Sequence, residues 1–154
     1  MESRLHGIVS LALIAAAMAI GWWTTLGSNL LAGLFYGALL LIGSFLIVYV
    51  FCTKCPIRAS GCRHVLPGRL TPWLPARLQT PYTVSDYLAV GVILLVLIAY
   101  PQIWLVPHKI TLLLFWLLLA AGLLEIILFV CQGCGNVRCL VCKVRNKPTE
   151  PIDA

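Results

Sequence analysis

Four long apolar runs dominate the chain, and most polar residues gather in the segments between them. A helix that crosses a bilayer needs about 20 mainly apolar residues. The runs therefore predict membrane-spanning helices at about 7–26, 30–51, 84–105 and 110–130. We expect an all-α membrane protein in which residues 1–154 form a single four-helix membrane domain.

The connections predict that these helices form two hairpins. Gly27-Ser28-Asn29 and Pro107-His108-Lys109 are short enough for tight turns. A long Cys-rich loop, 52–82, joins the hairpins, and a Cys-rich tail covers 131–154. The loop is also rich in proline, a composition that suits either a segment on the membrane surface or an ordinary connector. Thr83-Val84-Ser85-Asp86 favours a helix start. The third run either begins there or continues past Pro101 with a kink.

Composition supports a membrane protein. The chain is 61% hydrophobic and only 10% charged, with a mean hydropathy of +0.99, whereas soluble domains are about 25% charged. Residues 8–20 follow Arg4 as in a signal peptide, but Glu2 is unusual in a basic leader, so we expect a retained helix. With no base-reading motif, the net charge of +6 indicates orientation in the bilayer rather than nucleic-acid binding.

The distribution of Lys and Arg predicts that orientation. With four spans, ten of the eleven basic residues fall on one side of the membrane and only Lys109 falls on the other. Because cytoplasmic segments are enriched in Lys and Arg, we expect both termini and the central loop to be cytoplasmic. The cysteines would then lie where thiols are kept reduced.

All seven cysteines lie at or beyond the ends of two apolar runs. Cys52-Thr53-Lys54-Cys55 follows the second run and Cys131-Gln132-Gly133-Cys134 follows the fourth. Cys-x-x-Cys spacing lets two sulfurs turn toward one ion. Seven thiols and one imidazole divide into two four-coordinate metal sites, and the predicted ligands are Cys52, Cys55, Cys62, His64, Cys131, Cys134, Cys139 and Cys142.

Two pairings of these ligands are open. A cross-helix pairing joins the Cys52 pair to the Cys131 pair and leaves a second site of Cys62, His64, Cys139 and Cys142. A local pairing keeps each half of the chain separate. The cross-helix pairing is favoured, because both helix ends should lie at the same depth.

The ligand set predicts two structural zinc sites, since closed sites of four thiolates, or three with a histidine, suit zinc. Iron–sulfur clusters use the same ligands. Cys134, Cys139 and Cys142 have the Cys-x4-Cys-x2-Cys spacing of plant-type ferredoxins, although none of the surrounding ferredoxin sequence is present.

Three other features have competing interpretations. Glu125 is the ionisable residue deep in an apolar run; it is either functional or, as we expect, reaches the interface or accepts a hydrogen bond from Ser44 or a tyrosine. We expect His6 and His108 to be solvated. Gly33-x-x-x-Gly37, with Gly43, makes a smooth helix face that we expect to pack within the bundle.

These observations favour an accessory or structural subunit of a larger membrane complex, which we expect to be a redox complex. We expect the subunit to have no catalytic activity of its own and to contact lipid and partner membrane subunits. The alternatives are an electron-transfer subunit with iron–sulfur clusters and a protein that handles thiols or soft metals. Membrane proteins that generate disulfides have a similar layout, but they act on the oxidising face of the membrane.

Overall fold

The computed structural model describes residues 2–55, 71–75, 82–134 and 136. Every regular element in these ranges is helical, which confirms the all-α prediction. The elements are α1 (Glu2–Ser28), α2 (Leu30–Phe51), η1 (Cys52–Lys54), η2 (Thr71–Trp73), α4 (Val84–Ala99), α5 (Gln102–Leu105), α6 (Lys109–Glu125), the π-helical turn η3 (Ile126–Val130) and η4 (Cys131–Gly133).

Four stretches are long and apolar enough to cross a membrane, as predicted, and they indicate a multi-pass membrane protein. They cover Leu5–Ser28, Leu30–Lys54, Val84–Leu105 and Lys109–Val130. Helix α1 begins nearer the N-terminus than the predicted 7–26. The connection between α1 and α2 is also shorter than expected, because α1 continues to Ser28 and α2 begins at Leu30. Asn29, the one residue between them, caps α2: its side-chain oxygen accepts a hydrogen bond from the Ala32 N–H.

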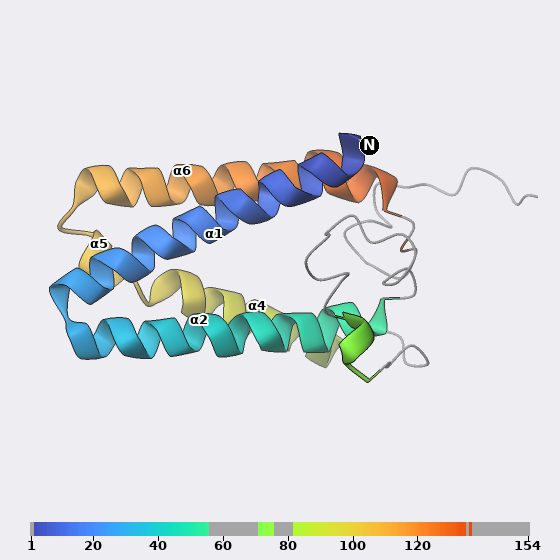
Figure 1. Cartoon of the computed structure of the whole chain (residues 1–154), viewed down its shortest axis with the longest axis horizontal. Coiled ribbons are helices and arrows are strands. Elements are labelled where there is room, and N and C mark those ends of the chain that lie inside the picture. Colours follow the sequence, from blue (N-terminus) through green and yellow to red (C-terminus); the bar gives the residue numbers. More distant parts are fainter. Residues whose placement is uncertain (1, 56–70, 76–81, 135, 137–154) are drawn as a thin grey trace, which may run out of the picture.

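The helices run back and forth, so the two Cys-x-x-Cys motifs lie at the same end of the bundle (Figure 1). Helix α1 packs against both α2 and α6, and α4 packs against α2. The N-terminus, the end of α2, the start of α4 and the end of α6 all lie at one end of the bundle (Figure 1). We call this the cysteine end. The short turns before α2 and α6 lie at the opposite end.

Glycines bring the helices into close contact, as predicted for the α2 face. A Cβ added at Gly33 would lie 2.4 Å from the Leu26 Cα atom, and one at Gly37 would lie 2.9 Å from Trp22 Nε1. Trp22 Nε1 also donates a 2.9 Å hydrogen bond to the Gly33 carbonyl oxygen. The Gly33–Gly37 face therefore packs against α1, within the bundle.

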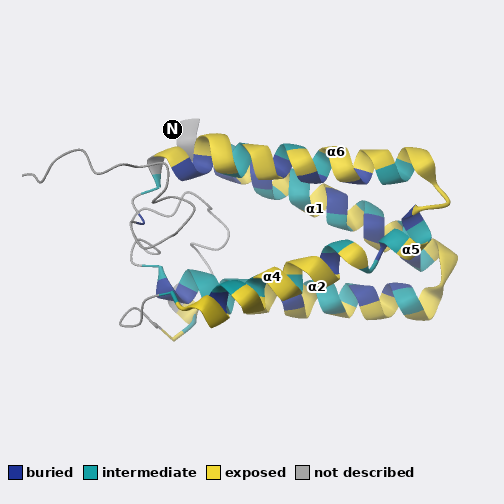
Figure 2. Cartoon of the chain, turned by 180° about the vertical axis from the view of Figure 1, so that it is seen from behind, coloured by how far each residue is buried: buried dark blue, intermediate teal, exposed yellow. Residues whose placement is uncertain are grey.

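The interior is small, and much of the outer surface is apolar. A buried cluster of Ala17, Leu105, Phe115 and Leu119 joins α1, α5 and α6. Exposed positions run along the outer faces of the helices (Figure 2), and many are large hydrophobic residues such as Leu31, Leu41 and Ile110. Apolar faces of this extent are unfavourable in water but are covered by acyl chains in a bilayer.

The third span is broken at Pro101, and neighbouring side chains satisfy its backbone. Helix α4 ends at Ala99 and α5 begins at Gln102. Proline has no N–H to donate to the carbonyl four residues earlier. The Tyr36 hydroxyl donates instead to that Leu97 oxygen at 2.7 Å, and Gln102 Nε2 donates to the Ile98 oxygen at 2.8 Å. These two donors replace backbone bonds at the break, which helps the bilayer to tolerate it.

Tyr36→Phe is expected to destabilise the protein by about 1–2 kcal/mol, because the Leu97 carbonyl would lose its donor at a buried position. Unfolding in SDS, followed by circular dichroism, measures the loss. Tyr100→Phe is the matched control: the Tyr100 hydroxyl lies 3.4 Å from the Ala32 oxygen, too long for a strong bond. Equal losses in the two variants would refute this role for Tyr36.

Candidate metal centre

The two Cys-x-x-Cys motifs adopt the same backbone conformation. Each begins a single 3₁₀ turn directly after a membrane helix. The Cys55 N–H donates to the Cys52 oxygen at 3.2 Å, and the Cys134 N–H donates to the Cys131 oxygen at 3.3 Å. Both closing cysteines are extended, with φ −73° and ψ 122° at Cys55 and φ −78° and ψ 118° at Cys134.

This turn suits chelation. Side chains three residues apart are eclipsed in a 3₁₀ turn, so both cysteines of a pair project on the same side. The four cysteines are thiols. Cys131 is buried, whereas the other three are half-buried, so they lie close to the bundle surface. Each motif can therefore offer two sulfurs to one ion after deprotonation.

Asn136 connects the two motifs. Its side chain is buried, with 4% exposed, although it lies just two residues beyond Cys134. Nδ2 lies 3.4 Å from Cys55 Sγ and 3.3 Å from the Tyr82 hydroxyl, in position to donate to both. The chain that follows the second motif thus contacts a sulfur of the first. Sequence reasoning missed Asn136. The feature that could have indicated it is a side-chain amide donor two residues after the predicted ligand Cys134.

A buried ion pair holds the first motif against α4. Lys54, between the two cysteines, is 3% exposed, and its Nζ atom lies 2.5 Å from Asp86 Oδ2. The same carboxylate accepts hydrogen bonds from the Thr83 N–H and hydroxyl at the start of α4. The helix start predicted at 83–86 is confirmed. Asp86 in this helix start also binds Lys54. In the sequence, Lys54 was counted only as one of the basic residues of the central loop.

Aromatic contacts strengthen the same junction. The Tyr82 hydroxyl donates to the Phe51 oxygen at 3.1 Å, and the two rings stack with centroids 4.7 Å apart. Tyr87 of α4 meets the Phe51 ring edge-on at 5.3 Å. The end of α2 is therefore fixed where Cys52 begins.

The structure brings some predicted ligands to one end of the bundle without assembling a site. Within the ranges that it describes, no three residues among His, Cys, Asp and Glu are grouped as metal ligands. The four thiols of the cross-helix pairing are thus not gathered around one centre here. The remaining predicted ligands lie outside the described residues; they are Cys62, His64, Cys139 and Cys142.

Glu125 has a partner that the sequence did not indicate. Its Oε2 atom lies 3.0 Å from His6 Nδ1, and the His6 ring stacks on Phe129 with centroids 4.5 Å apart. The expected partners, Ser44 or a tyrosine, were wrong. His6, which we expected to be solvated, is 35% exposed and has Glu125 as a partner. The start of α1 packs close enough to the end of α6 for this contact to form. The sequence did not indicate it, because the two residues are 119 positions apart. His108 is exposed, as predicted.

Glu125→Gln is expected to change stability by at most about 1 kcal/mol and to leave metal content unchanged. Both side chains are partly exposed, 35% for His6 and 25% for Glu125, and glutamine keeps an acceptor for the imidazole. Unfolding in SDS and metal analysis of the variant test this. Loss of metal from Glu125→Gln would instead make Glu125 part of a metal site.

The chain matches no protein-family model, no curated protein and no solved structure.

Proposed function

We propose that the protein is a small integral membrane metal-binding protein with cysteine-ligated sites at the cytoplasmic surface. It would serve as an accessory or structural subunit of a larger membrane complex, one with a redox activity. The observation that supports this most is the matched 3₁₀ turn at Cys52–Cys55 and Cys131–Cys134 at one end of the bundle. The two four-residue turns share this conformation although only their cysteines are identical.

Zinc is the metal that these groups suit best. Sites of four thiolates, or of three with His64, are closed and leave no position for a reactive water, so they would stabilise structure rather than catalyse. We favour the cross-helix pairing, because Asn136 next to the second motif contacts Cys55 Sγ of the first. The thiols would have to move closer together around the ion, since they are not grouped as ligands in the structure.

The cytoplasmic location rests on charge. Lys109 begins α6 at the end opposite the cysteines, and the other ten basic residues belong to segments that the four spans place at the cysteine end. This asymmetry favours a cytoplasmic cysteine end. The loop 52–82 and the tail 131–154 would then form the surface that docks a partner, because the spans leave little else outside the bilayer.

An electron-transfer subunit with iron–sulfur clusters is the second candidate, and the Asn136 contact favours it specifically. Hydrogen bonds to cluster sulfurs tune the reduction potential. Asn136 places an amide donor 3.4 Å from Cys55 Sγ. A cluster here would lie just outside the bilayer, where it could pass electrons between a soluble partner and a membrane carrier.

Metal analysis of the purified full-length chain separates the two candidates. A colourless preparation with two zinc ions per chain supports the structural role. Visible absorption with iron and acid-labile sulfide supports electron transfer. A chain without bound metal and with reactive thiols contradicts both and favours thiol or soft-metal handling.

Asn136→Ala is expected to weaken metal binding by about 10–100-fold, the usual effect of removing a group that orients a metal ligand. Cobalt replacing zinc gives a sulfur-to-metal absorption band, which should shift because Cys55 Sγ loses its N–H donor. Tyr82→Phe is the control: it removes the hydroxyl that contacts both the Asn136 amide and the Phe51 oxygen but keeps the amide next to Cys55 Sγ, so the band should stay in place. If the band is unchanged in Asn136→Ala, the amide plays no part at the metal.

A further inference from the structure

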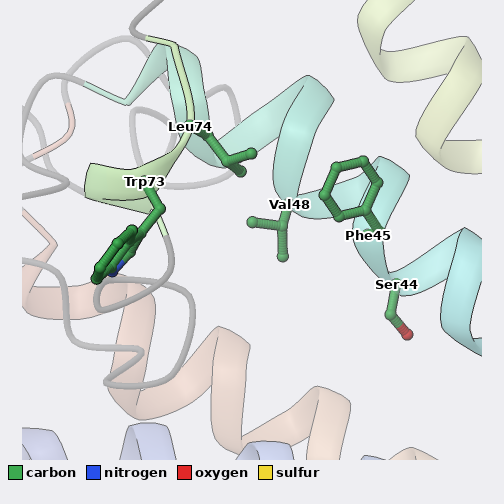
Figure 3. Close-up of a pocket in the computed structure, with 5 residues that line it drawn as sticks. All are labelled: Ser44, Phe45, Val48, Trp73 and Leu74. Carbon is green, nitrogen blue, oxygen red and sulfur yellow. The ribbon is translucent and has the colours of Figure 1, made fainter.

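A groove lies on the outer face of α2 near the cysteine end. Its walls are Ser44, Phe45 and Val48 of α2 and Trp73 and Leu74 of the segment that contains η2 (Figure 3), and its volume is about 380 Å³. The lining is carbon apart from the Ser44 hydroxyl and the Trp73 indole N–H. It offers too few polar groups to hold a polar ligand or a headgroup.

The groove lies at the depth of acyl chains. Ser44 is seven residues before Phe51, the last residue of α2, which corresponds to about 10 Å of helix rise. Trp73, at the outer edge of the groove, is 88% exposed. Tryptophan is enriched at the membrane interface, where its ring contacts apolar chains and its N–H contacts ester or phosphate oxygens. The groove therefore extends from the interface into the hydrocarbon region.

The rest of α2 argues against a partner helix in the groove. Closely packed membrane helices meet at small residues. Gly33 and Gly37 already face α1, and a Cβ added at Gly43 would lie 3.1 Å from Leu97 Cδ1 of α4. The outer face instead carries large, exposed side chains, among them Leu41 and Phe45. Such a surface fits a flexible hydrocarbon chain better than a second helix.

We propose that this groove binds one acyl chain of a phospholipid, with the Trp73 ring at the level of the ester groups. In this arrangement Leu74 would cover the acyl chain on the side away from α2, and Val48 would form the floor of the groove. The bound lipid would hold the η2 segment against α2 near the first Cys-x-x-Cys motif. The inference needs the membrane location of the spans, but it does not depend on the proposed metal sites.

Titration with phospholipid that carries bromine on its acyl chains tests the proposal, because bromine quenches tryptophan only on contact. The full chain in detergent micelles is titrated, and the Trp73 signal is the difference between wild type and Trp73→Phe. We expect quenching that saturates near one lipid per chain. Quenching that only follows the bulk lipid fraction would overturn the proposal.

Two variants and a control make the test specific. Val48→Phe fills the groove and should abolish the saturable component, whereas Leu74→Ala removes one wall and should weaken binding. Leu31→Phe adds a similar ring at a 78% exposed position near the opposite end of α2 and should leave the titration unchanged. Equal titrations for Val48→Phe and Leu31→Phe would overturn the proposal. So would self-association that protects Trp73 from the lipid, since the occupant would then be a second copy of the chain.

Discussion

Lys54→Met should lower the free energy of unfolding by about 3–5 kcal/mol, the usual effect of removing one partner from a buried ion pair. The Asp86 side chain is mostly buried and would keep its Thr83 donors but lose its cation. The pair as a whole need not stabilise the fold, because both charges lost their hydration on burial. The large effect comes from the uncompensated carboxylate. Unfolding in SDS, followed by circular dichroism, measures it.

The controls separate charge from packing. Lys54→Met with Asp86→Asn removes both charges and should recover most of the lost stability. Lys109→Met removes an exposed charge at the opposite end of the bundle and should change stability by no more than about 0.5 kcal/mol. If Lys54→Met behaves like Lys109→Met, the ion pair does not hold the first cysteine motif to α4.

Cys55→Ser should weaken binding of one of the two proposed zinc ions by on the order of 100-fold or more. Structural zinc sites with four ligands bind with about 10–16 kcal/mol, so each thiolate makes a large contribution. Zinc per chain, measured after dialysis against a competing chelator, should fall from two to one. Thr53→Ser changes the same turn but keeps the cysteines and a hydroxyl, which in the wild type donates to the Tyr49 oxygen at 2.6 Å. It should retain both ions.

The double variant Cys55→Ser with Cys134→Ser then identifies the pairing. In the cross-helix pairing both substitutions fall in the same site, so one zinc ion per chain remains. In the local pairing they fall in different sites, and no zinc remains. If the double variant retains two ions, neither pairing is correct.

The span positions could be predicted from the sequence because lipid imposes a strong and local requirement. A long apolar run must be helical in a bilayer, and charged residues are costly within it. Hence 30–51 agrees with α2 to the residue. Pro101 marked where a kink could form, because proline lacks an N–H, but the sequence left open whether the third span is one piece or broken there. The identity of the group that satisfies Leu97 was not predictable, because Tyr36 reaches it from a different helix.

The side-chain contacts at the cysteine end were less predictable for the same physical reason. His6 and Glu125 are 119 residues apart, and Lys54 and Asp86 are 32 apart. No local periodicity connects such residues, and they meet only after α1 and α4 have packed. The spacing of Cys52 and Cys55 indicated a chelating turn. It carried no information about Asn136, whose contact with Cys55 depends on how the chain returns after η4.

Labelling the cysteines from each side of the membrane tests the proposed metal sites most directly. Sealed vesicles of known orientation are treated with a membrane-impermeant maleimide, with and without prior release of metal by a strong chelator. We expect all seven thiols to be protected until metal is released and then to react only from the cytoplasmic side. Labelling from the other side, or full labelling without the chelator, would contradict a set of metal-bound cysteines at one cytoplasmic surface.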